Sequence, residues 1–394
     1  MGAISPFLTA LSASSAVIDS ALIDWDVRLR IIEQATDTRS KREYKGLPKG
    51  KYSPMQFYIS NEKVSGIYND QKYTINKTFR KNLCSMLVQN GLEHLAKDSA
   101  LINHFAYQYV FENPVVFEKN IIEFSKNQDD PNPNTWMPSL KLEQNKKYLK
   151  NSNIFEAVQS TNWNNMRFKP AKNFDGSNSW LVEFRPMDLP ITSQEKYYLM
   201  FFTTLLHRII TDKKIFTNFY IPISSADTNM LRCVKRNAVV KEKFLFRKNF
   251  YGDKAKDIDY QPKSRNKKDK DAKRKLFFKN EMIEISLKDL LLGGKDHQGF
   301  KGLIETFISV NKEFLKSESN NINEDIVGDI WKCFDFMVKR SEGKLLTSSA
   351  LIRKFVRGHK DYAFNSVVEG KVADDLIEFV LKVQTENYHQ DLFD

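Results

Sequence analysis

Two short segments near the middle of the chain constrain its fold more than any other feature. Ser160–Pro170 reads STNWNNMRFKP and Trp180–Met187 reads WLVEFRPM, and both alternate between apolar and polar residues. This alternation is typical of strands whose two faces differ in environment. The intervening residues, PAKNFDGSNS, are rich in turn formers. We therefore predict an antiparallel β-hairpin.

The predicted hairpin gathers charged side chains on one face. Arg167 and Lys169 share a face of the first strand, and Glu183 and Arg185 share a face of the second. Three cations around a carboxylate suit an anion held together with a divalent metal, as in phosphoryl transfer. An ordinary solvated sheet face shows the same alternation. The spacing alone leaves both interpretations open.

Composition bounds the class of protein. A chain of 394 residues is long enough for two or three domains. Its three cysteines are too few for a disulfide framework, and they favour a reducing, cytoplasmic location. No CxxC or HExxH pattern indicates a zinc site. The most apolar run, Tyr197–Ile210, is too short to span a bilayer and predicts a buried helix, so we expect no membrane association.

The net charge of +12 raises the question of a nucleic-acid partner. Much of the charge lies in Lys254–Lys279, where Asp residues interrupt the basic run and aromatic residues are few. This composition favours a solvated, flexible insertion over a nucleic-acid surface, and we expect no nucleic-acid partner. We predict a sheet-bearing part over 1–250, a basic flexible insertion over 251–279 and a mainly helical region over 280–394.

Periodicity predicts the fold class. Apolar residues at helical spacing predict helices over Thr78–Glu112, Ser193–Thr211 and Ser225–Lys241. Short alternating strands beside long helices indicate an α+β protein. No G-x-G-x-x-G, G-x-x-x-x-G-K-[ST] or G-x-S-x-G motif supports a Rossmann, P-loop or hydrolase fold.

The N-terminal segment Ile4–Ile32 reads as strand, turn and strand. Alternation in its second half places Asp24, Asp26 and Arg28 together on one strand face. On that face the two carboxylates either orient Arg28 or simply meet solvent.

The two hairpin segments closely resemble the heavy, catalytic subunit of eukaryotic glutamate–cysteine ligase. Six further segments resemble that family in the same order. They are Ser5–Ser15, Asp24–Arg28, Gly91–Phe105, Ile221–Val240, Ser341–Val356 and His359–Val368. The resemblance covers nearly the whole chain, and it is to the C-terminal portion of the family. We expect the family's N-terminal portion to be missing.

The resemblance implies a fold and an activity. The expected fold is a glutamine-synthetase-like curved antiparallel sheet with packed helices and a mainly helical C-terminal part. The expected reaction is ATP-dependent ligation of the γ-carboxylate of L-glutamate to L-cysteine through γ-glutamyl phosphate. It gives γ-glutamylcysteine, in the first step of glutathione biosynthesis. The implied cofactors are ATP and Mg²⁺, and the implied partners are the substrates and a regulatory light subunit.

The resemblance also implies roles for five residues. Arg185 is the expected catalytic residue and contacts the γ-carboxylate or the phosphoryl group. Arg28 is expected to bind the glutamate substrate, Arg167 and Lys169 the nucleotide phosphates, and Glu183 a metal ion. The alternative is a truncated, catalytically inactive relative that acts as a scaffold or regulator.

Overall fold

The structure is a computed structural model. It describes residues 2–26, 28, 77–89, 91–111, 122–126, 136–140, 165–169, 181–212, 221–248, 268, 282–294, 300–312, 315 and 321–385. After a short 3-10 turn at Gly2–Ile4, the helices are α1 (Ser5–Leu11), α4 (Lys77–Gln89), α5 (Glu93–Ala96), α6 (Ser99–Phe111), α9 (Ser193–Asp212), α10 (Ile223–Cys233), α11 (Ala238–Lys241), α13 (Leu287–Leu292), α14 (Gly302–Val310), α16 (Asn321–Ser341), α17 (Ser348–Gly358) and α18 (Gly370–Thr385).

The described strands form four separate two-stranded antiparallel sheets. The pairs are β1 (Val17–Ile18) with β2 (Ala21–Leu22), β3 (Ile122–Lys126) with β4 (Trp136–Leu140), β5 (Met166–Lys169) with β6 (Leu181–Phe184), and β7 (Lys243–Arg247) with β8 (Met282–Ser286). Long helices beside short antiparallel strands confirm the α+β class. The glutamine-synthetase-like curved sheet stays a prediction.

The predicted helices are present, with breaks that have local causes. The range Thr78–Glu112 contains α4, α5 and α6. Gly91 follows α4 with a φ of +73°, the left-handed conformation that commonly ends helices. The carboxylate of Asp98 accepts hydrogen bonds from the backbone N–H groups of Ala100 (2.7 Å) and Leu101 (3.2 Å), which caps α6.

The other two predicted helices differ in outcome. The helix predicted over Ser193–Thr211 is α9. The range Ser225–Lys241 splits into α10 and α11, because Asn237 adopts a left-handed φ of +56° between them.

The strand–turn–strand prediction for Ile4–Ile32 is wrong in its first half. Ser5–Leu11 forms α1, whose seven residues are all buried. A short apolar run buried on all sides has no polar face to reveal its period, so a strand and a helix look alike in sequence. Among the described residues of this range, the small β1–β2 hairpin retains the predicted turn, and residues 27 and 29–32 lie outside the described part of the chain.

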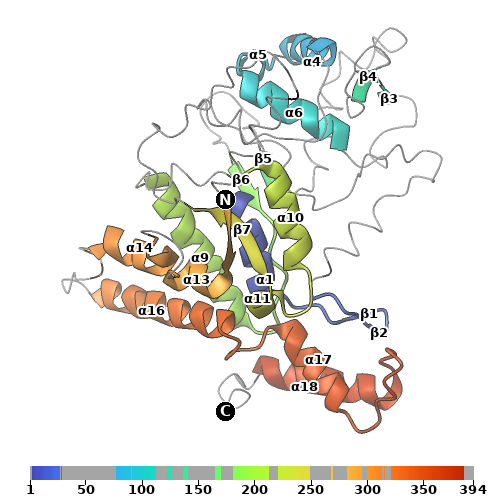
Figure 1. Cartoon of the computed structure of the whole chain (residues 1–394), viewed down its shortest axis with the longest axis vertical. Coiled ribbons are helices and arrows are strands. Elements are labelled where there is room, and N and C mark those ends of the chain that lie inside the picture. Colours follow the sequence, from blue (N-terminus) through green and yellow to red (C-terminus); the bar gives the residue numbers. More distant parts are fainter. Residues whose placement is uncertain are drawn as a thin grey trace.

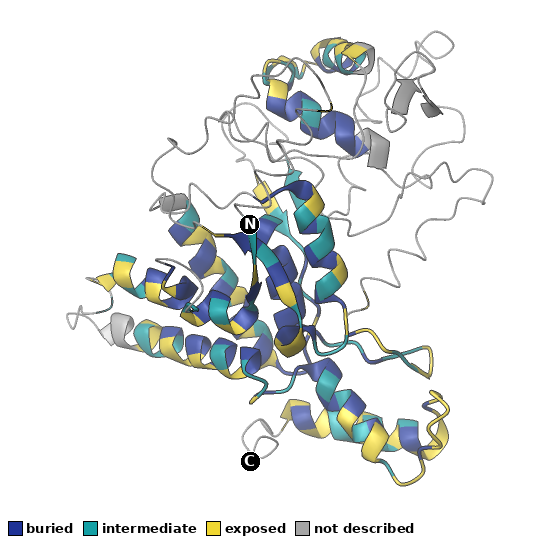
Figure 2. Ribbon diagram, viewed as in Figure 1, coloured by how far each residue is buried: buried dark blue, intermediate teal, exposed yellow. Residues whose placement is uncertain are grey.

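The core surrounds α1. Figure 1 shows α1 at the centre of the lower body, with α9, α10, α16 and the β7–β8 pair around it, and Figure 2 shows buried residues concentrated there. The ring of Phe7 packs edge-on against Phe244 and Phe246 of β7, at centroid distances of 5.2 and 5.8 Å. The pairing of β7 with β8 brings together residues on either side of the predicted basic insertion. That insertion, 251–279, lies outside the described residues except for Lys268.

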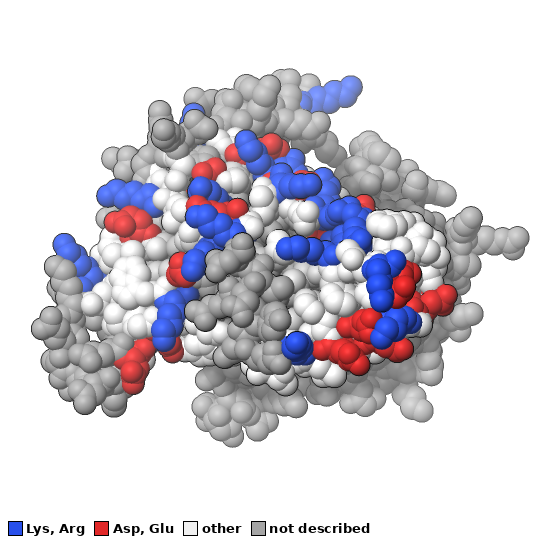
Figure 3. Space-filling model, turned by 90° about the horizontal axis from the view of Figure 1, so that it is seen from below, with Lys and Arg blue, Asp and Glu red and all other residues white. Residues whose placement is uncertain are grey.

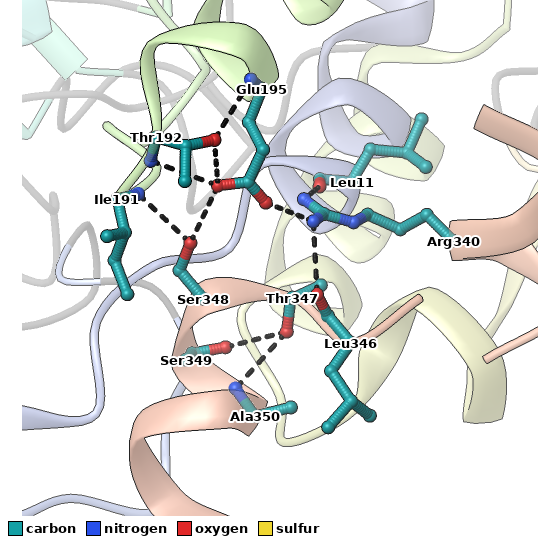
Figure 4. A network of polar contacts seen from close by, with 10 residues as sticks. All are labelled: Leu11, Ile191, Thr192, Glu195, Arg340, Leu346, Thr347, Ser348, Ser349 and Ala350. Atoms are coloured by element: carbon teal, nitrogen blue, oxygen red, sulfur yellow. Dashed lines mark hydrogen bonds and ion pairs between the residues drawn. The ribbon is translucent and has the colours of Figure 1, made fainter. Parts of the chain in front are cut away.

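A buried ion pair connects three helices in this body. Glu195, in the first turn of α9, pairs with Arg340 at the end of α16, and both side chains are buried. Glu195 also accepts hydrogen bonds from the Thr192 N–H and hydroxyl groups and from the hydroxyl of Ser348 at the start of α17 (Figure 4). Arg340 donates to the carbonyl of Leu11 at the end of α1. The network fixes α9, α16 and α17 to the central helix.

The surface carries charges of both signs. At the end of the molecule where α17 and α18 lie, Lys and Arg side chains lie beside Asp and Glu side chains over much of the face (Figure 3). Lys371 pairs with Asp375 at 2.8 Å in α18, for example. None of the helices in the described part of the chain has both the length and the apolar character to cross a bilayer.

Candidate functional site: a hairpin with three cations on one carboxylate

The predicted hairpin is present as the β5–β6 pair. Met166 lies opposite Phe184, and Arg167 lies directly opposite Glu183. Arg185 extends the ladder by one residue, because its N–H donates to the carbonyl of Asn165 at 2.8 Å. The register places the charged side chains of both strands on one face, as their alternation predicted.

The hairpin lies between two hydrophobic clusters. Phe184 packs against the core around α1, whereas Phe168 packs against the smaller core of α4, α5 and α6. The ring of Phe168 also meets His104 edge-on at 6.4 Å. In Figure 1 the two strands accordingly lie between the upper helices and the lower body.

The base of the hairpin is attached to α1 by a buried amide. The side-chain N–H of Asn165 donates to the hydroxyl of Ser5 at 2.7 Å, and Asn165 is almost fully buried. The same residue accepts the Arg185 N–H through its carbonyl. The position of Arg185 therefore depends on the first turn of α1.

Glu183 is surrounded by cations. Its Oε1 lies 2.7 Å from Nε of Arg185, and its Oε2 lies 2.8 Å from Nζ of Lys169 and 3.2 Å from Nε of Arg167. The hydrogen bond from Arg185 is the largest cause that lowers the pKa of Glu183 to about 2, with Lys169 and Arg167 contributing. The carboxylate is therefore ionised at any physiological pH.

The cluster has an excess of positive charge. Three cations face one carboxylate, so the group carries about two unit charges that Glu183 does not neutralise. Burial lowers the pKa of Arg167, although a guanidinium stays protonated near neutrality. Lys169 and Glu183 are each about one-third exposed, at 38% and 32% of their side chains. A partly exposed positive group of this kind suits an anion such as phosphate.

The charged face of the hairpin offers one carboxylate, Glu183, as a ligand for a divalent cation. Among the described residues, no group of three His, Cys, Asp or Glu side chains is close enough together to hold a metal. Mg²⁺ is often bound by one or two carboxylates together with substrate phosphates and water. Glu183 fits that mode of binding, in which the protein supplies a minority of the ligands.

Arg28 lies outside the hairpin and pairs with a residue that sequence reasoning missed. Its Nε is 3.2 Å from Oδ1 of Asp188, and its side chain is 56% exposed. Asp188 follows Arg185 by three residues, and its side chain is buried. The only sequence signal was its place directly after the WLVEFRPM segment.

The predicted strand face of Asp24, Asp26 and Arg28 is wrong. Asp24 is exposed and pairs with Arg236 at 3.4 Å. Asp26 is buried and pairs with Arg353 of α17 at 2.7 Å. Trp25 forms a single antiparallel bridge with Lys235, in which the Asp26 N–H donates to the carbonyl of Val234, and the carboxylate of Asp26 accepts from the Asn237 N–H.

Fold and site together define an α+β protein whose central hairpin presents three cations around one carboxylate. A family model for glutamate–cysteine ligase matches residues 1–135 and 134–383. The chain therefore belongs to the glutamate–cysteine ligase family.

Curated relatives match almost the whole chain. It is 30% identical to the human glutamate–cysteine ligase catalytic subunit over 387 residues, which is 96% of this chain and 52% of that protein. It is 29% identical to the glutamate–cysteine ligase of Dictyostelium discoideum, over 96% of this chain and 53% of the relative. It is also 29% identical to the glutamate–cysteine ligase of Schizosaccharomyces pombe, over 99% of this chain and 49% of that relative. The chain spans about half the length of these relatives.

Proposed function

We propose that the chain carries out, or forms part of a protein that carries out, the ATP-dependent ligation of glutamate to cysteine. Membership of the glutamate–cysteine ligase family supports the reaction. The observation that carries the proposal is the hairpin, where Arg185, Arg167 and Lys169 converge on Glu183. A glutamine-synthetase-like curved sheet as the frame of the site is part of the same proposal.

The reaction requires several anions to be held close together. A carboxylate is a poor acyl donor, and transfer of the terminal phosphoryl group of ATP to the γ-carboxylate of glutamate makes it competent. The amine of cysteine then attacks this acyl phosphate, the new amide bond forms, and phosphate leaves with ADP as the other product. Fixed cations stabilise the negative charge that develops in both steps.

The residues divide this work by position. Arg185 would contact the γ-carboxylate and the phosphoryl group, and Arg167 and Lys169 the phosphates of the nucleotide. Arg28 would hold the other carboxylate of glutamate. Glu183 would hold Mg²⁺ together with phosphate oxygens, and the cations that pair with it would then turn to the phosphates. Bound Mg²⁺ supplies charge neutralisation of the phosphoryl group.

We also propose a cytoplasmic protein with a regulatory light subunit as partner. The three cysteines are free, which suits a reducing compartment. The human, mouse and rat relatives are named catalytic subunits.

The test is ADP release measured with glutamate, with cysteine, with both and with neither. It is made on the 394-residue chain and on the longest open reading frame that contains it. We expect full release to require both amino acids in the longer protein. The proposal would be overturned if the longer protein is folded and its ADP release depends on neither glutamate nor cysteine.

The chain spans about half the length of its relatives, and this observation favours a second candidate function beside the first. A catalytically inactive scaffold or regulator would release no ADP by itself. It would instead change the rate of an intact ligase mixed with it, which the same assay measures.

A further inference from the structure

Asp188 is a buried carboxylate with an organised set of donors. Its Oδ2 accepts a hydrogen bond from the hydroxyl of Ser15 at 2.9 Å and from the N–H of Ser14 at 3.4 Å. Its own N–H donates to the hydroxyl of Ser12 at 2.9 Å. The turn after α1 therefore fixes the carboxylate, and Oδ1 faces Arg28.

The contact with Asp188 involves one edge of the Arg28 guanidinium. The Nε atom lies 3.2 Å from Oδ1, while the side chain as a whole is 56% exposed. A guanidinium has five donors in a planar fork. An anchor at Nε sets the plane of the group and leaves the two Nη atoms to bind a carboxylate bidentately. A free arginine loses rotamer entropy on such binding, and the anchor has already removed part of that freedom.

The same segment connects Arg28 to the hairpin. Asp188 follows Arg185 by three residues, so their Cα atoms lie within about 10 Å of each other. The carbonyl of Pro186, between them, accepts a hydrogen bond from the hydroxyl of Thr9 in α1 at 2.9 Å. Two guanidinium groups, Arg185 and the Arg28 that Asp188 holds, are thus attached to one segment that α1 fixes in place.

We infer that Asp188 is a positioning residue, which orients Arg28 for one carboxylate of an amino dicarboxylate while Arg185 meets the other. This inference rests on the proposed function and deepens it. Sequence proximity alone would assign the orienting role to Asp24, but that carboxylate is exposed and pairs with Arg236. An ordinary ion pair of a half-exposed arginine would contribute little stability and have no effect on substrate affinity.

The test compares three variants in the longest open reading frame that contains the chain. Asp188→Asn keeps the shape and removes the charge, Asp188→Glu keeps the charge, and Asp24→Asn is the matched control. We expect Asp188→Asn to raise the KM for glutamate at least tenfold and the KM for ATP less than twofold. Asp188→Glu should recover part of the glutamate affinity, and Asp24→Asn should change neither constant more than twofold.

A second measurement does not depend on turnover. Nitrogen-15 labelling of arginine side chains lets NMR follow the Nε–H signal of Arg28 during titration with glutamate. We expect a glutamate-dependent shift in the wild-type protein and its loss in Asp188→Asn. If Asp188→Asn unfolds the protein, Ser15→Ala takes its place, because it removes one donor to Asp188 and leaves Arg28 untouched.

The outcomes separate this inference from the proposed function. Equal changes in both KM values, or none, would overturn the role of Asp188 while the ligase activity stands. A glutamate shift that Asp188→Asn abolishes, without ADP release, would support the role of Asp188 and overturn the activity. If the wild-type protein shows no glutamate-dependent shift and releases no ADP, both the role of Asp188 and the proposed activity are overturned.

Discussion

The buried pair of Glu195 and Arg340 gives the clearest prediction about stability. We consider Arg340→Met, which keeps a long side chain and removes the charge. It would leave the Glu195 carboxylate buried without the charged partner that now pairs with it, while the hydrogen bonds from Thr192 and Ser348 remain. The carbonyls of Leu11 and Leu346 would also lose the donors that Arg340 supplies at 3.1 and 3.0 Å.

The magnitude follows from the burial of both partners. The side chain of Arg340 is 0% exposed and that of Glu195 is 3% exposed. Removing one partner of such a pair costs about 3–5 kcal/mol, because the remaining charge stays buried after its ion-pair partner is lost. For cooperative unfolding of 394 residues, an unfolding entropy of about 0.8 kcal/mol/K converts this cost to a fall in Tm of roughly 4–6 °C.

The assay is thermal unfolding followed by circular dichroism, with Lys339→Met as the control. Lys339 is the neighbouring residue of α16, and its pair with Asp335 is exposed on both sides. Such a pair contributes about 0.3–0.5 kcal/mol, so this variant should melt within about 1 °C of wild type. A fall in Tm for Arg340→Met no greater than that for Lys339→Met would refute the stabilising role of the network.

Three further predictions concern the site and the backbone. The pKa of Glu183, measured by carbon-13 NMR, should be about 2 and should rise in Arg185→Gln. The contribution of this carboxylate to stability is present above its unfolded pKa near 4.5 and is lost as the pH falls toward 2. A titration midpoint near 4.5 in the wild-type protein would contradict this prediction. Arg28→Lys should raise the KM for glutamate more than the KM for ATP, since an ammonium lacks the bidentate fork, and equal rises would indicate a structural role. The Tm of Gly302→Ala should be well below that of Gly91→Ala, because a Cβ at Gly302 would lie 2.4 Å from backbone atoms whereas one at Gly91 would enter open space. Equal falls in Tm for the two variants would refute this prediction.

The strands and helices with clear periodicity could be predicted from sequence. The hairpin and its charged face follow from alternation, because Phe184 and Phe168 pack on two cores while the charged side chains lie together on the opposite face. The helix α1 could not be identified, since burial on every side removes the polar positions that mark a period. At the break, the N–H of Asn237 donates to the side-chain carboxylate of Asp26, which lies 211 residues away in sequence.

The candidate site was predicted only in part. Residues of one hairpin are close in sequence, so their pairing could be anticipated from register. The partner of Arg28 could not, because Asp188 is 160 residues distant and contacts it only when the segment after β6 packs on α1. The nearer carboxylates, Asp24 and Asp26, face other arginines.

The most direct test of the central claim is ADP release by Glu183→Gln in the longest open reading frame that contains the chain, with glutamate and cysteine both present. The substitution keeps the shape of the side chain and removes the charge that three cations surround. We predict a fall in rate of roughly 10²–10³, as expected for loss of a few kcal/mol of transition-state stabilisation. Near-normal turnover in the folded variant would contradict the account and leave Glu183 as an ordinary ion pair of the sheet.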